Sequence, residues 1–481
     1  MNRKIITYTL GKMLIIYAMI LIVPLIIALG YWEVKSVGAF FITMILTLSL
    51  GLFLKRKKPK SKTFTTQEGV LTTALIWFTL ILLGTLPFYL SGAIPSFTDA
   101  FFEATSGFTT TGSTILRDVE ALPRAMLFWR GMTHFLGGIG VLVFAFAILS
   151  ESGNEGYYLL KSEMTGSTFG KLVSRLKHTA IILCIIYCLM AVVLLILLLL
   201  GGLNWFDAIV HTFSTAGTGG FSSYNDSIAH FKSSYVHFVL SFGMLAFSIN
   251  FGVYFSMWRN KGRGFLKSEE VRLFLTIVCF ATIFMSAYLY KEGYDWFTAI
   301  KNGLFTTASI ISTTGFGMED FMLWPLIAQL VVLGLMFTGG CAGSTAGGFK
   351  ISRLIVTVRV AGEYLQRAFS PRRMTTIRLD KKPLNANDRY EIGAYFILYV
   401  VSFWVIFAII CIDKYDFETT FAAVLTTFNN IGPGLGEIGA SGIFADFTPL
   451  SKWVLSIGMV AGRLEIIPVL LFLNPASWRA K

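Results

Sequence analysis

Long apolar segments alternate along the chain with short polar ones, and their lengths suit membrane spans. Ten such segments can be traced, at residues 12–30, 37–54, 70–91, 126–149, 179–201, 236–258, 271–290, 324–348, 391–412 and 452–473. Most approach the ~20 residues that a helix needs to cross ~30 Å of hydrocarbon. The pattern predicts an all-α polytopic membrane protein with about ten transmembrane helices.

A second pattern recurs four times between these segments. Each time an apolar anchor stands fifteen residues before a glycine, and a polar turn rich in Gly and Thr ends the stretch. The stretches run from Phe97 to Gly112, Trp205 to Gly220, Ile300 to Gly315 and Phe417 to Gly432. Their helical parts are too short to span a bilayer, so we expect each to re-enter the membrane from outside, sheltered by protein.

Turns of Thr and Gly allow backbone carbonyls to face a common axis, where they replace the water shell of a monovalent cation. Four copies would surround the ion, so the repeat predicts a cation pore. The candidate ion-binding residues are Thr110, Thr111, Gly112, Thr218, Gly219, Gly220, Thr313, Thr314, Gly315, Asn430, Ile431 and Gly432.

The repeat also predicts how the chain is organised. Two leading transmembrane helices and a basic loop occupy residues 1–62. Four units follow, each a helix, a re-entrant pore helix, a filter turn and a second helix, and they should surround a central pore. We place these units at residues 63–160, 161–265, 266–385 and 386–481.

Composition and charge agree with a membrane protein. Of 481 residues, 55% are hydrophobic and 14% are charged, and the formal net charge is +13. If both termini are cytoplasmic, the cytoplasmic segments carry 30 of the 40 lysines and arginines, ten of them in 349–390. This bias is the positive-inside signature of a multi-pass protein of the cytoplasmic (inner) membrane, and it leaves no basic stripe for nucleic acid.

The third unit contains an interrupted segment. Five glycines occur in the ten residues 339–348, which favours unwound backbone below the third filter. We predict a gating loop across the conduction path, although close helix packing through small residues is an alternative. The candidate gate residues in this loop are Gly339, Gly340, Cys341, Gly343, Ser344, Gly347 and Gly348.

Arg463 lies within the last apolar segment, where a charge is costly and should face the protein interior. Glu465, two positions on, falls on a different helix face and is not an intrahelical partner. We expect Arg463 to bind the freed carbonyls of the 339–348 loop, to complete the gate and to add an electrostatic barrier. The alternative is a buried arginine that only ties helices together.

Other polar residues are less specific. Asp99, Glu103, Asp207 and Glu418 lie in or at the start of the re-entrant helices, and we favour helix capping and complementation of the helix dipole over direct ion binding. The five histidines show no ligand spacing with one another and are expected to be packing residues. We find no nucleophile, base or metal constellation, so we expect no enzyme activity and no cofactor.

Several motifs together resemble the Trk/Ktr/HKT superfamily of potassium transporters. They are the four filters, GGCAGSTAGGFK at 339–350, NNIGPGLGEIG at 429–439 and GRLEI at 462–466. The two leading helices and the Gly-Arg-Leu-Glu ending resemble the bacterial TrkH/TrkG branch. The resemblance implies potassium uptake by a homodimer in which each subunit has its own pore, regulated by a cytosolic TrkA-type nucleotide-binding protein.

By position, the family's filter glycines fall on Gly112, Gly220, Gly315 and Gly432, its gating loop on 339–348 and its pore arginine on Arg463. Relatives that pass sodium often carry Ser at the first of these glycines, so Gly112 favours potassium. Asn430 and Ile431 replace Thr in the fourth filter, which leaves a less selective potassium and sodium pore as an alternative. The other alternative is a proton- or sodium-coupled potassium symporter.

Overall fold

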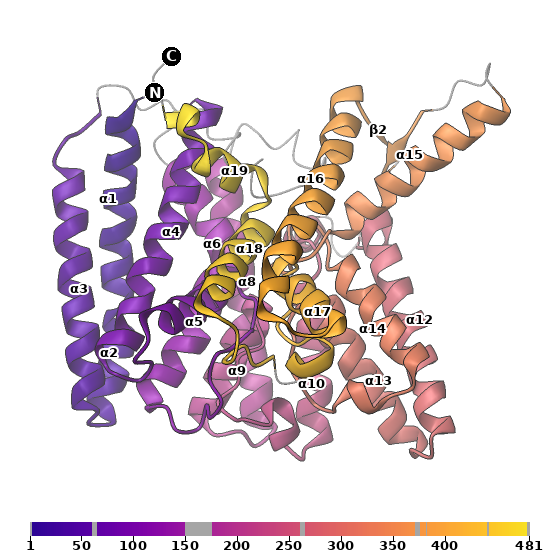
Figure 1. The fold of residues 1–481 in the computed structure, drawn as a ribbon, viewed down its shortest axis with the longest axis horizontal. Helices are drawn as coiled ribbons and strands as arrows, with labels where there is room; N and C mark the ends of the chain where they lie inside the picture. Colours follow the sequence, from indigo (N-terminus) through magenta and orange to yellow (C-terminus); the bar gives the residue numbers. More distant parts are fainter. Residues whose placement is uncertain are drawn as a thin grey trace.

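The structure is a computed structural model that describes residues 2–59, 65–149, 176–259, 265–370, 376–380, 382–439 and 442–478. The unit boundaries expected after residues 62 and 160, and the basic residues Arg479 and Lys481, lie outside these ranges. Both ends of the described chain lie at the same end of the helical assembly (Figure 1).

The leading segments form a layer at one edge of the molecule (Figure 1). This layer consists of α1 (Arg3–Ile20), α2 (Ile22–Gly30) and α3 (Val34–Lys55). Helices α1 and α3 approach closely where Gly11 faces Gly51, because a Cβ on Gly11 would lie 2.8 Å from the Gly51 carbonyl oxygen. Small residues at a helix crossing allow this approach, which replaces the hydrophobic driving force that is missing within a bilayer.

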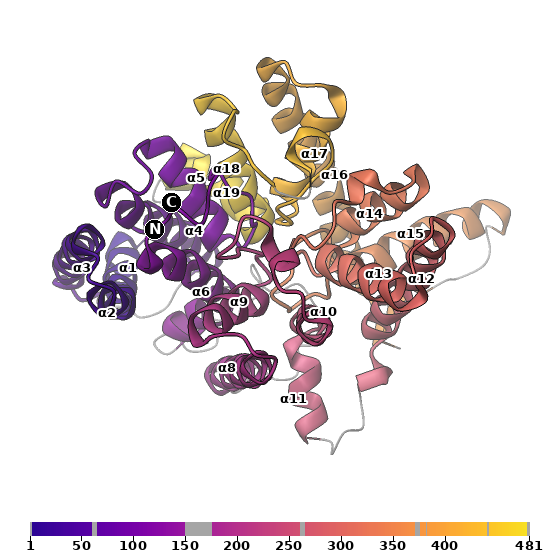
Figure 2. The ribbon, with the colours of Figure 1, turned by 90° about the horizontal axis from the view of Figure 1, so that it is seen from below.

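Four helical units follow and surround a common centre (Figure 2). Each contains a long helix, a short helix, a turn and a further helix, as the sequence pattern predicts. Their helices are α4 (Thr66–Leu90), α5 (Phe97–Phe108) and α6 (Arg124–Leu149); α8 (Leu176–Leu200), α9 (Trp205–Gly217), α10 (Ser234–Phe247) and α11 (Phe251–Arg259); α12 (Glu269–Lys291), α13 (Trp296–Ile311), α14 (Leu326–Thr338) and α15 (Ile351–Phe369); and α16 (Ala386–Ile410), α17 (Phe417–Phe428), α18 (Pro449–Leu464) and α19 (Ile467–Leu473).

The remaining described elements are short. A two-stranded antiparallel hairpin, β1 (Arg378–Leu379) with β2 (Lys382–Pro383), follows α15, and several single turns of 3₁₀ helix connect the longer elements. The amphipathic helix α15 projects from the body of the molecule, and the hairpin lies beside it (Figure 1).

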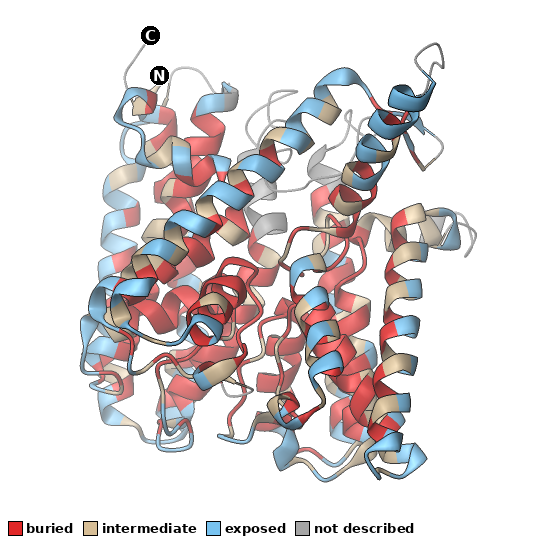
Figure 3. Cartoon of the chain, turned by 45° about the vertical axis from the view of Figure 1, so that its right-hand side comes forward, coloured by how far each residue is buried: buried red, intermediate tan, exposed pale blue. Residues whose placement is uncertain are grey.

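The short helices lie inside the molecule and most of the long ones lie outside (Figure 3). From Ala100 to Phe108 every residue of α5 is buried, whereas α8 exposes apolar side chains such as Leu189 and Val192. A surface of this kind is stable in hydrocarbon and not in water. The fold is therefore that of a helical polytopic membrane protein.

Six helical spans in the described residues are long and apolar enough to cross a membrane unbroken: Arg3–Gly30, Val34–Lys55, Gln67–Leu90, Ala180–Leu200, Glu269–Lys291 and Ala386–Asp413. The interruption predicted in the segment 324–348 is present between α14 and α15. Two segments that we expected to be continuous are broken. The segment 236–258 bends by 91° between α10 and α11, and the segment 452–473 breaks at Glu465 and Ile466.

Local sequence explains where the short helices begin. Each starts directly after a residue whose side-chain oxygen accepts a hydrogen bond from a backbone N–H in its first turn. These N-caps are Ser96, Asn204, Asp295 and Asp416. Asp99, Asp207 and Glu418 lie in the first turns of their helices, where a carboxylate complements the helix dipole as expected, but none of them is the N-cap, so the capping part of the expectation was wrong.

The α1–α3 contact yields a first prediction. Gly11→Ala should lower the free energy of unfolding by about 1–3 kcal/mol, because its Cβ meets backbone atoms of α3 that cannot move independently. Gly38→Ala on α3 is the matched control, since a Cβ there meets nothing within 4 Å and improves helix propensity. Thermal unfolding in detergent would contradict the prediction if the two variants behaved alike.

Candidate cation pore

The four glycine turns share one backbone conformation. Two residues before each glycine, the chain takes a left-handed φ of 53°, 56°, 57° or 55°, at Thr110, Thr218, Thr313 and Asn430 respectively. The glycines themselves have φ of 85°, 80°, 77° and 94°, at Gly112, Gly220, Gly315 and Gly432. A β-branched threonine rarely adopts this region, and such strain persists only where the surroundings impose it.

The turns meet one another in a closed ring. A Cβ built on Gly112 would lie 2.2 Å from the carbonyl oxygen of Gly219, the residue before the next glycine. The same relation continues in chain order at 2.0, 1.8 and 2.8 Å, for Gly220 on Thr314, Gly315 on Ile431 and Gly432 on Thr111. Four backbone oxygens, one from each unit, thus come together where only glycine permits the approach.

Side-chain hydrogen bonds connect the first and fourth turns. The Thr111 hydroxyl lies 2.8 Å from that of Thr109 and accepts from Nδ2 of Asn430 at 2.9 Å. Nδ2 of Asn430 also donates to the carbonyl oxygen of Met459 at 2.9 Å. The fourth turn therefore keeps the backbone of the other three although its residues differ, and Asn430 binds it to the first.

A buried ion pair supports the first two turns. Nε of Arg130, on α6, donates to Glu103 on α5 at 2.8 Å, and both side chains are at most 2% exposed. Glu103 also accepts from the Thr114 hydroxyl and from the N–H of Ile115, while Nη1 of Arg130 donates to the Ser222 carbonyl oxygen at 3.1 Å. The pair therefore joins the segments that follow Gly112 and Gly220.

Asp99 and Asp207, two of the other acidic residues of the re-entrant helices, also bind protein partners. Asp99 accepts from Nζ of Lys452 on α18 at 2.6 Å. Asp207 accepts from the hydroxyls of Ser223 and Tyr224, at 2.8 and 2.7 Å. Glu103 is thus a buried counter-ion and not a cap, which the sequence reasoning missed. Its spacing held a signal, since Glu103 and His211 both stand nine residues before a filter glycine.

Two of the histidines pack against the same turns. Nε2 of His211 lies 3.0 Å from the hydroxyl of Ser222, which stands two residues after Gly220. Thr114, which binds Glu103, stands two residues after Gly112, so the two contacts occupy corresponding positions in the first and second units. His134 stacks on Phe221, and its Nδ1 lies 2.8 Å from the Gly107 carbonyl oxygen. Their packing role is as expected. Within the described part of the chain, no three His, Cys, Asp or Glu side chains cluster as ligands of a metal ion.

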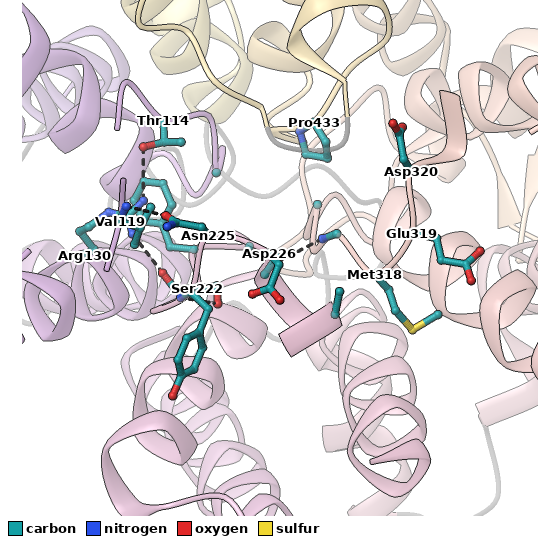
Figure 4. A pocket seen from close by; sticks show the side chains of 18 residues that line it. Thr114, Val119, Arg130, Ser222, Asn225, Asp226, Met318, Glu319, Asp320 and Pro433 are labelled. Carbon is teal, nitrogen blue, oxygen red and sulfur yellow. Dashed lines mark hydrogen bonds between the residues drawn. The ribbon is translucent and has the colours of Figure 1, made fainter. Parts of the chain in front are cut away.

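A cavity of 240 Å³ lies on the side of the ring that is formed by the residues after the turn glycines. Its wall includes Gly112, Gly220 and Gly315, and the segments that follow them. Arg130 and Ser222 lie on one side of the cavity, and Glu319 and Asp320 lie on the other (Figure 4). Burial raises the pKa of the Glu319 carboxyl above its ordinary value. Since Glu103 neutralises Arg130, the cavity favours cations.

The 339–348 loop lies against the opposite side of the ring. The N–H of Gly347 donates to the Thr313 hydroxyl at 2.6 Å, and a Cβ on Gly347 would lie 2.3 Å from the Asn429 carbonyl oxygen. Both contacts are to residues that precede the filter glycines, whereas the cavity is lined by residues that follow them. Gly340 and Cys341 are buried, and the loop holds no helical turn. The interpretation as an unwound loop is confirmed.

Arg463 binds this loop. It lies in the last turn of α18 and donates from Nη1 to the Thr345 carbonyl oxygen at 2.5 Å and from Nη2 to the Gly137 carbonyl oxygen at 3.0 Å. The expected contact with a loop carbonyl is therefore present. Arg463 does not lie in the middle of a continuous helix, however, because the chain breaks immediately after it.

Two further carboxylates hold the loop region and were not identified from the sequence. Glu270, at the start of α12, accepts from the N–H of Ala342 at 2.7 Å and from that of Ser352 at 3.1 Å. Glu465 pairs with Arg353 on α15 at 2.6 Å. Nothing in the local sequence marks Arg353 as buried, because it stands in a long basic stretch.

The buried pair gives a second prediction. Arg130→Gln should lower the free energy of unfolding by about 3–5 kcal/mol, because Glu103 is left charged and without its partner. Glu103→Gln combined with Arg130→Gln should recover part of that loss. The matched control is Arg117→Gln, whose partner Asp446 is 67% exposed, and it should cost no more than about 1 kcal/mol. Equal thermal destabilisation by Arg130→Gln and Arg117→Gln would contradict this account.

Comparisons with known proteins agree with this architecture. The family model TrkH, described as a cation transport protein, matches residues 36–479. The chain is 32% identical over the whole of both chains to the Trk system potassium uptake protein TrkH of Halomonas elongata, and 33% identical, again over both whole chains, to that of Escherichia coli K12. It is also similar to the crystal structure of the potassium transporter TrkH from Vibrio parahaemolyticus, with a TM-score of 0.89, 32% identity and full coverage of both chains.

Proposed function

The chain belongs to the TrkH family of cation transport proteins, and from this premise we propose that it takes up potassium across the cytoplasmic membrane through a channel-like pore. The transported ion is K⁺, and the selectivity filter consists of the turns that end at Gly112, Gly220, Gly315 and Gly432. Both termini are cytoplasmic. The curated relatives are named as transporters and not as enzymes.

The ring of backbone oxygens is the observation that carries this proposal. Each of its oxygens comes from a residue directly before a filter glycine, and each is covered by the glycine of the preceding unit. Backbone carbonyls can replace the water of a dehydrated cation without a formal charge, and so bind it weakly enough for release. The four pore helices also direct the partial negative charge of their carboxyl ends toward the centre.

The gate in this proposal is the 339–348 loop together with Arg463. The loop covers the filter on the side opposite the cavity, and the guanidinium group holds one of its carbonyls. A cation that leaves the filter in this direction meets backbone and a positive charge. Passage requires the loop to move, and glycines permit that rearrangement at small steric cost.

The two alternatives differ in the driving force and in selectivity. A symporter coupled to protons or sodium would use alternating access, usually between inverted repeats, whereas the four units here repeat in one direction around one centre. We would expect a pore that passes both potassium and sodium if the backbone conformation of the fourth turn differed from that of the other three. Asn430 adopts the same left-handed conformation as the threonines, which favours the selective pore.

We also propose that the subunit forms a homodimer and that a cytosolic TrkA-type nucleotide-binding protein regulates it. Support comes from the family and from the basic segment 349–390, in which α15 projects from the body of the molecule. Its described residues include Arg359 and Arg367, both partly exposed and each paired with a carboxylate.

Ion flux into liposomes that contain only the purified protein tests this function. We expect potassium and rubidium to enter well above sodium and lithium, with no pH gradient and with the voltage clamped. Flux that appears only with a proton or sodium gradient would replace the pore by the coupled symporter.

A matched pair of glycine variants connects this flux to the ring. Gly220→Ala should abolish potassium flux, because its Cβ would lie 2.0 Å from the Thr314 carbonyl oxygen. Gly202→Ala is the control, since Gly202 has a similar φ of 88° but open space around it. It should lower stability by about 1 kcal/mol and leave flux intact. Equal flux in the two variants would remove the ring from the conduction path.

Arg463→Ala tests the gate. We expect potassium flux several-fold above that of the unchanged protein, with the order of preference among ions unaltered, because the loop loses the donor to Thr345. Size-exclusion chromatography and thermal unfolding serve as controls for folding. Loss of folded protein in this variant and in Arg463→Lys would instead assign the residue a purely structural role.

A further inference from the structure

The bend between α10 and α11 is sharper than its local sequence explains, although the Ser248 hydroxyl donates back to the Met244 carbonyl oxygen, a bond that often bends helices. The two helices meet at 91°, and the break contains only Ser248, Ile249 and Asn250. Sharp kinks usually occur at proline, at glycine pairs, or where another group enters the helical hydrogen-bond ladder. The break holds neither proline nor glycine, which indicates that another group enters the ladder.

The inserted group is the 339–348 loop. The carbonyl oxygen of Phe247 accepts from the Thr345 hydroxyl at 3.1 Å and from its N–H at 3.4 Å. The N–H of Phe251 donates to the Gly343 carbonyl oxygen at 3.1 Å. In an unbroken α-helix, the Phe251 N–H would bond to the Phe247 carbonyl oxygen. The loop therefore stands between the two halves of one helical hydrogen bond.

The next rung of the ladder is divided in the same way. The Ser248 carbonyl oxygen accepts from the N–H of Cys341 at 3.0 Å. Its partner in a continuous helix would be the N–H of Gly252, which donates instead to Oδ1 of Asn250 at 2.7 Å. The loop and the Asn250 side chain together satisfy every group that the break exposes at these two rungs.

One more hydrogen bond exists only while the helices are bent. The hydroxyl of Tyr254, on α11, donates to the Ala246 carbonyl oxygen, on α10, at 2.8 Å. These residues are eight positions apart, which corresponds to about 12 Å along a straight α-helix. Straightening α10 and α11 would therefore break this bond.

We propose that the break at residues 248–250 is the binding site of the gating loop in its closed position. Asn250 and Tyr254 are positioning residues that stabilise the bend and so hold the loop closed. The loop leaves this site as α10 and α11 straighten, and the Phe251 N–H then donates to the Phe247 carbonyl oxygen. This inference rests on the proposed function of the loop as a gate, and it identifies what holds the loop in place.

Burial makes this exchange of partners necessary. Phe247, Ser248 and Phe251 are each at most 1% exposed while the loop is in place, so the loop and not water pairs their backbone groups in this arrangement. Buried backbone groups are almost always paired, and one left unpaired is costly. A loop that simply withdrew would leave several such groups, whereas straightening pairs them again. The gate therefore has two discrete arrangements and no stable intermediate.

Two substitutions at Asn250 should change flux in opposite directions. Asn250→Ala removes the Gly252 cap and improves helix propensity, so it should raise potassium flux about three- to tenfold. Asn250→Pro cannot lie inside a straight helix, so it should lower flux about tenfold or more. Within the described residues the Asn250 N–H donates to no backbone oxygen, and proline would remove only its contact with the Cys341 thiol of the loop. A residue with only a structural role would lower flux in both variants.

Tyr254→Phe supplies an independent test. It removes the hydroxyl bond to Ala246 but keeps the ring, and it should raise flux about threefold. Tyr290→Phe, at a half-exposed position on α12, is the matched control and should leave flux unchanged. The order of preference among potassium, rubidium and sodium should be the same in all of these variants, because the filter is untouched.

The bend itself can be measured by the distance between spin labels at Phe242 on α10 and Met257 on α11. Alanine replaces the partly or fully exposed cysteines Cys184, Cys188, Cys279 and Cys411 in this background, and the buried Cys341 is retained. A straight helix separates the labelled positions by about 22 Å, and a right-angled bend brings them closer. Asn250→Ala should populate the longer distance, and Asn250→Pro should show only the shorter one.

The inference is overturned if Asn250→Ala and Asn250→Pro change flux in the same direction, or if the distance stays short in Asn250→Ala while its flux rises. Failure of the proposed function looks different. In that case the unchanged protein carries no potassium at all, and the distance distributions still report whether α10 and α11 straighten.

Discussion

The close approach of four backbone turns is the constraint on which the rest of the structure depends. Each filter glycine lies directly over the carbonyl oxygen of the next turn, at a separation that no Cβ tolerates. The turns are polar and lack regular hydrogen bonding, so they are stable in a membrane only inside a protein shell. The short helices α5, α9, α13 and α17 supply that shell, because each is capped at its start and is mostly buried after its first turn.

Ion pairs and charge-assisted hydrogen bonds connect the units around this ring. Arg130, which pairs with Glu103 inside the first unit, donates to the Ser222 carbonyl oxygen of the second, and Lys452 with Asp99 joins the fourth unit to the first. Helix α6 has a particular part in this, since Arg130, His134 and Gly137 lie on one of its faces and reach the cavity, the filter and Arg463 respectively. A buried charge is tolerated only beside its partner, so these contacts specify how the units pack.

Two broken helices fit each other on the side of the ring opposite the cavity. The loop between α14 and α15 supplies the donors and the acceptor that the break between α10 and α11 requires. Neither break satisfies all of its own backbone groups, and each is stabilised by the presence of the other. Glu270, Arg463 and Thr313 then hold the loop from three further directions, through α12, α18 and the third turn.

The sequence by itself determined the membrane class, the fourfold repeat, the four glycine turns and the unwound loop, because hydrophobic length and glycine spacing are local properties of the chain. The contact between Arg463 and the loop followed from the cost of a charge in hydrocarbon. Only the tertiary structure decided the partners of Glu103, Glu270 and Glu465, since each meets a residue of another element far along the chain. The bend at residues 248–250 is the clearest case. It holds neither proline nor glycine, and a loop about ninety residues away occupies the hydrogen bonds that a continuous helix would make there.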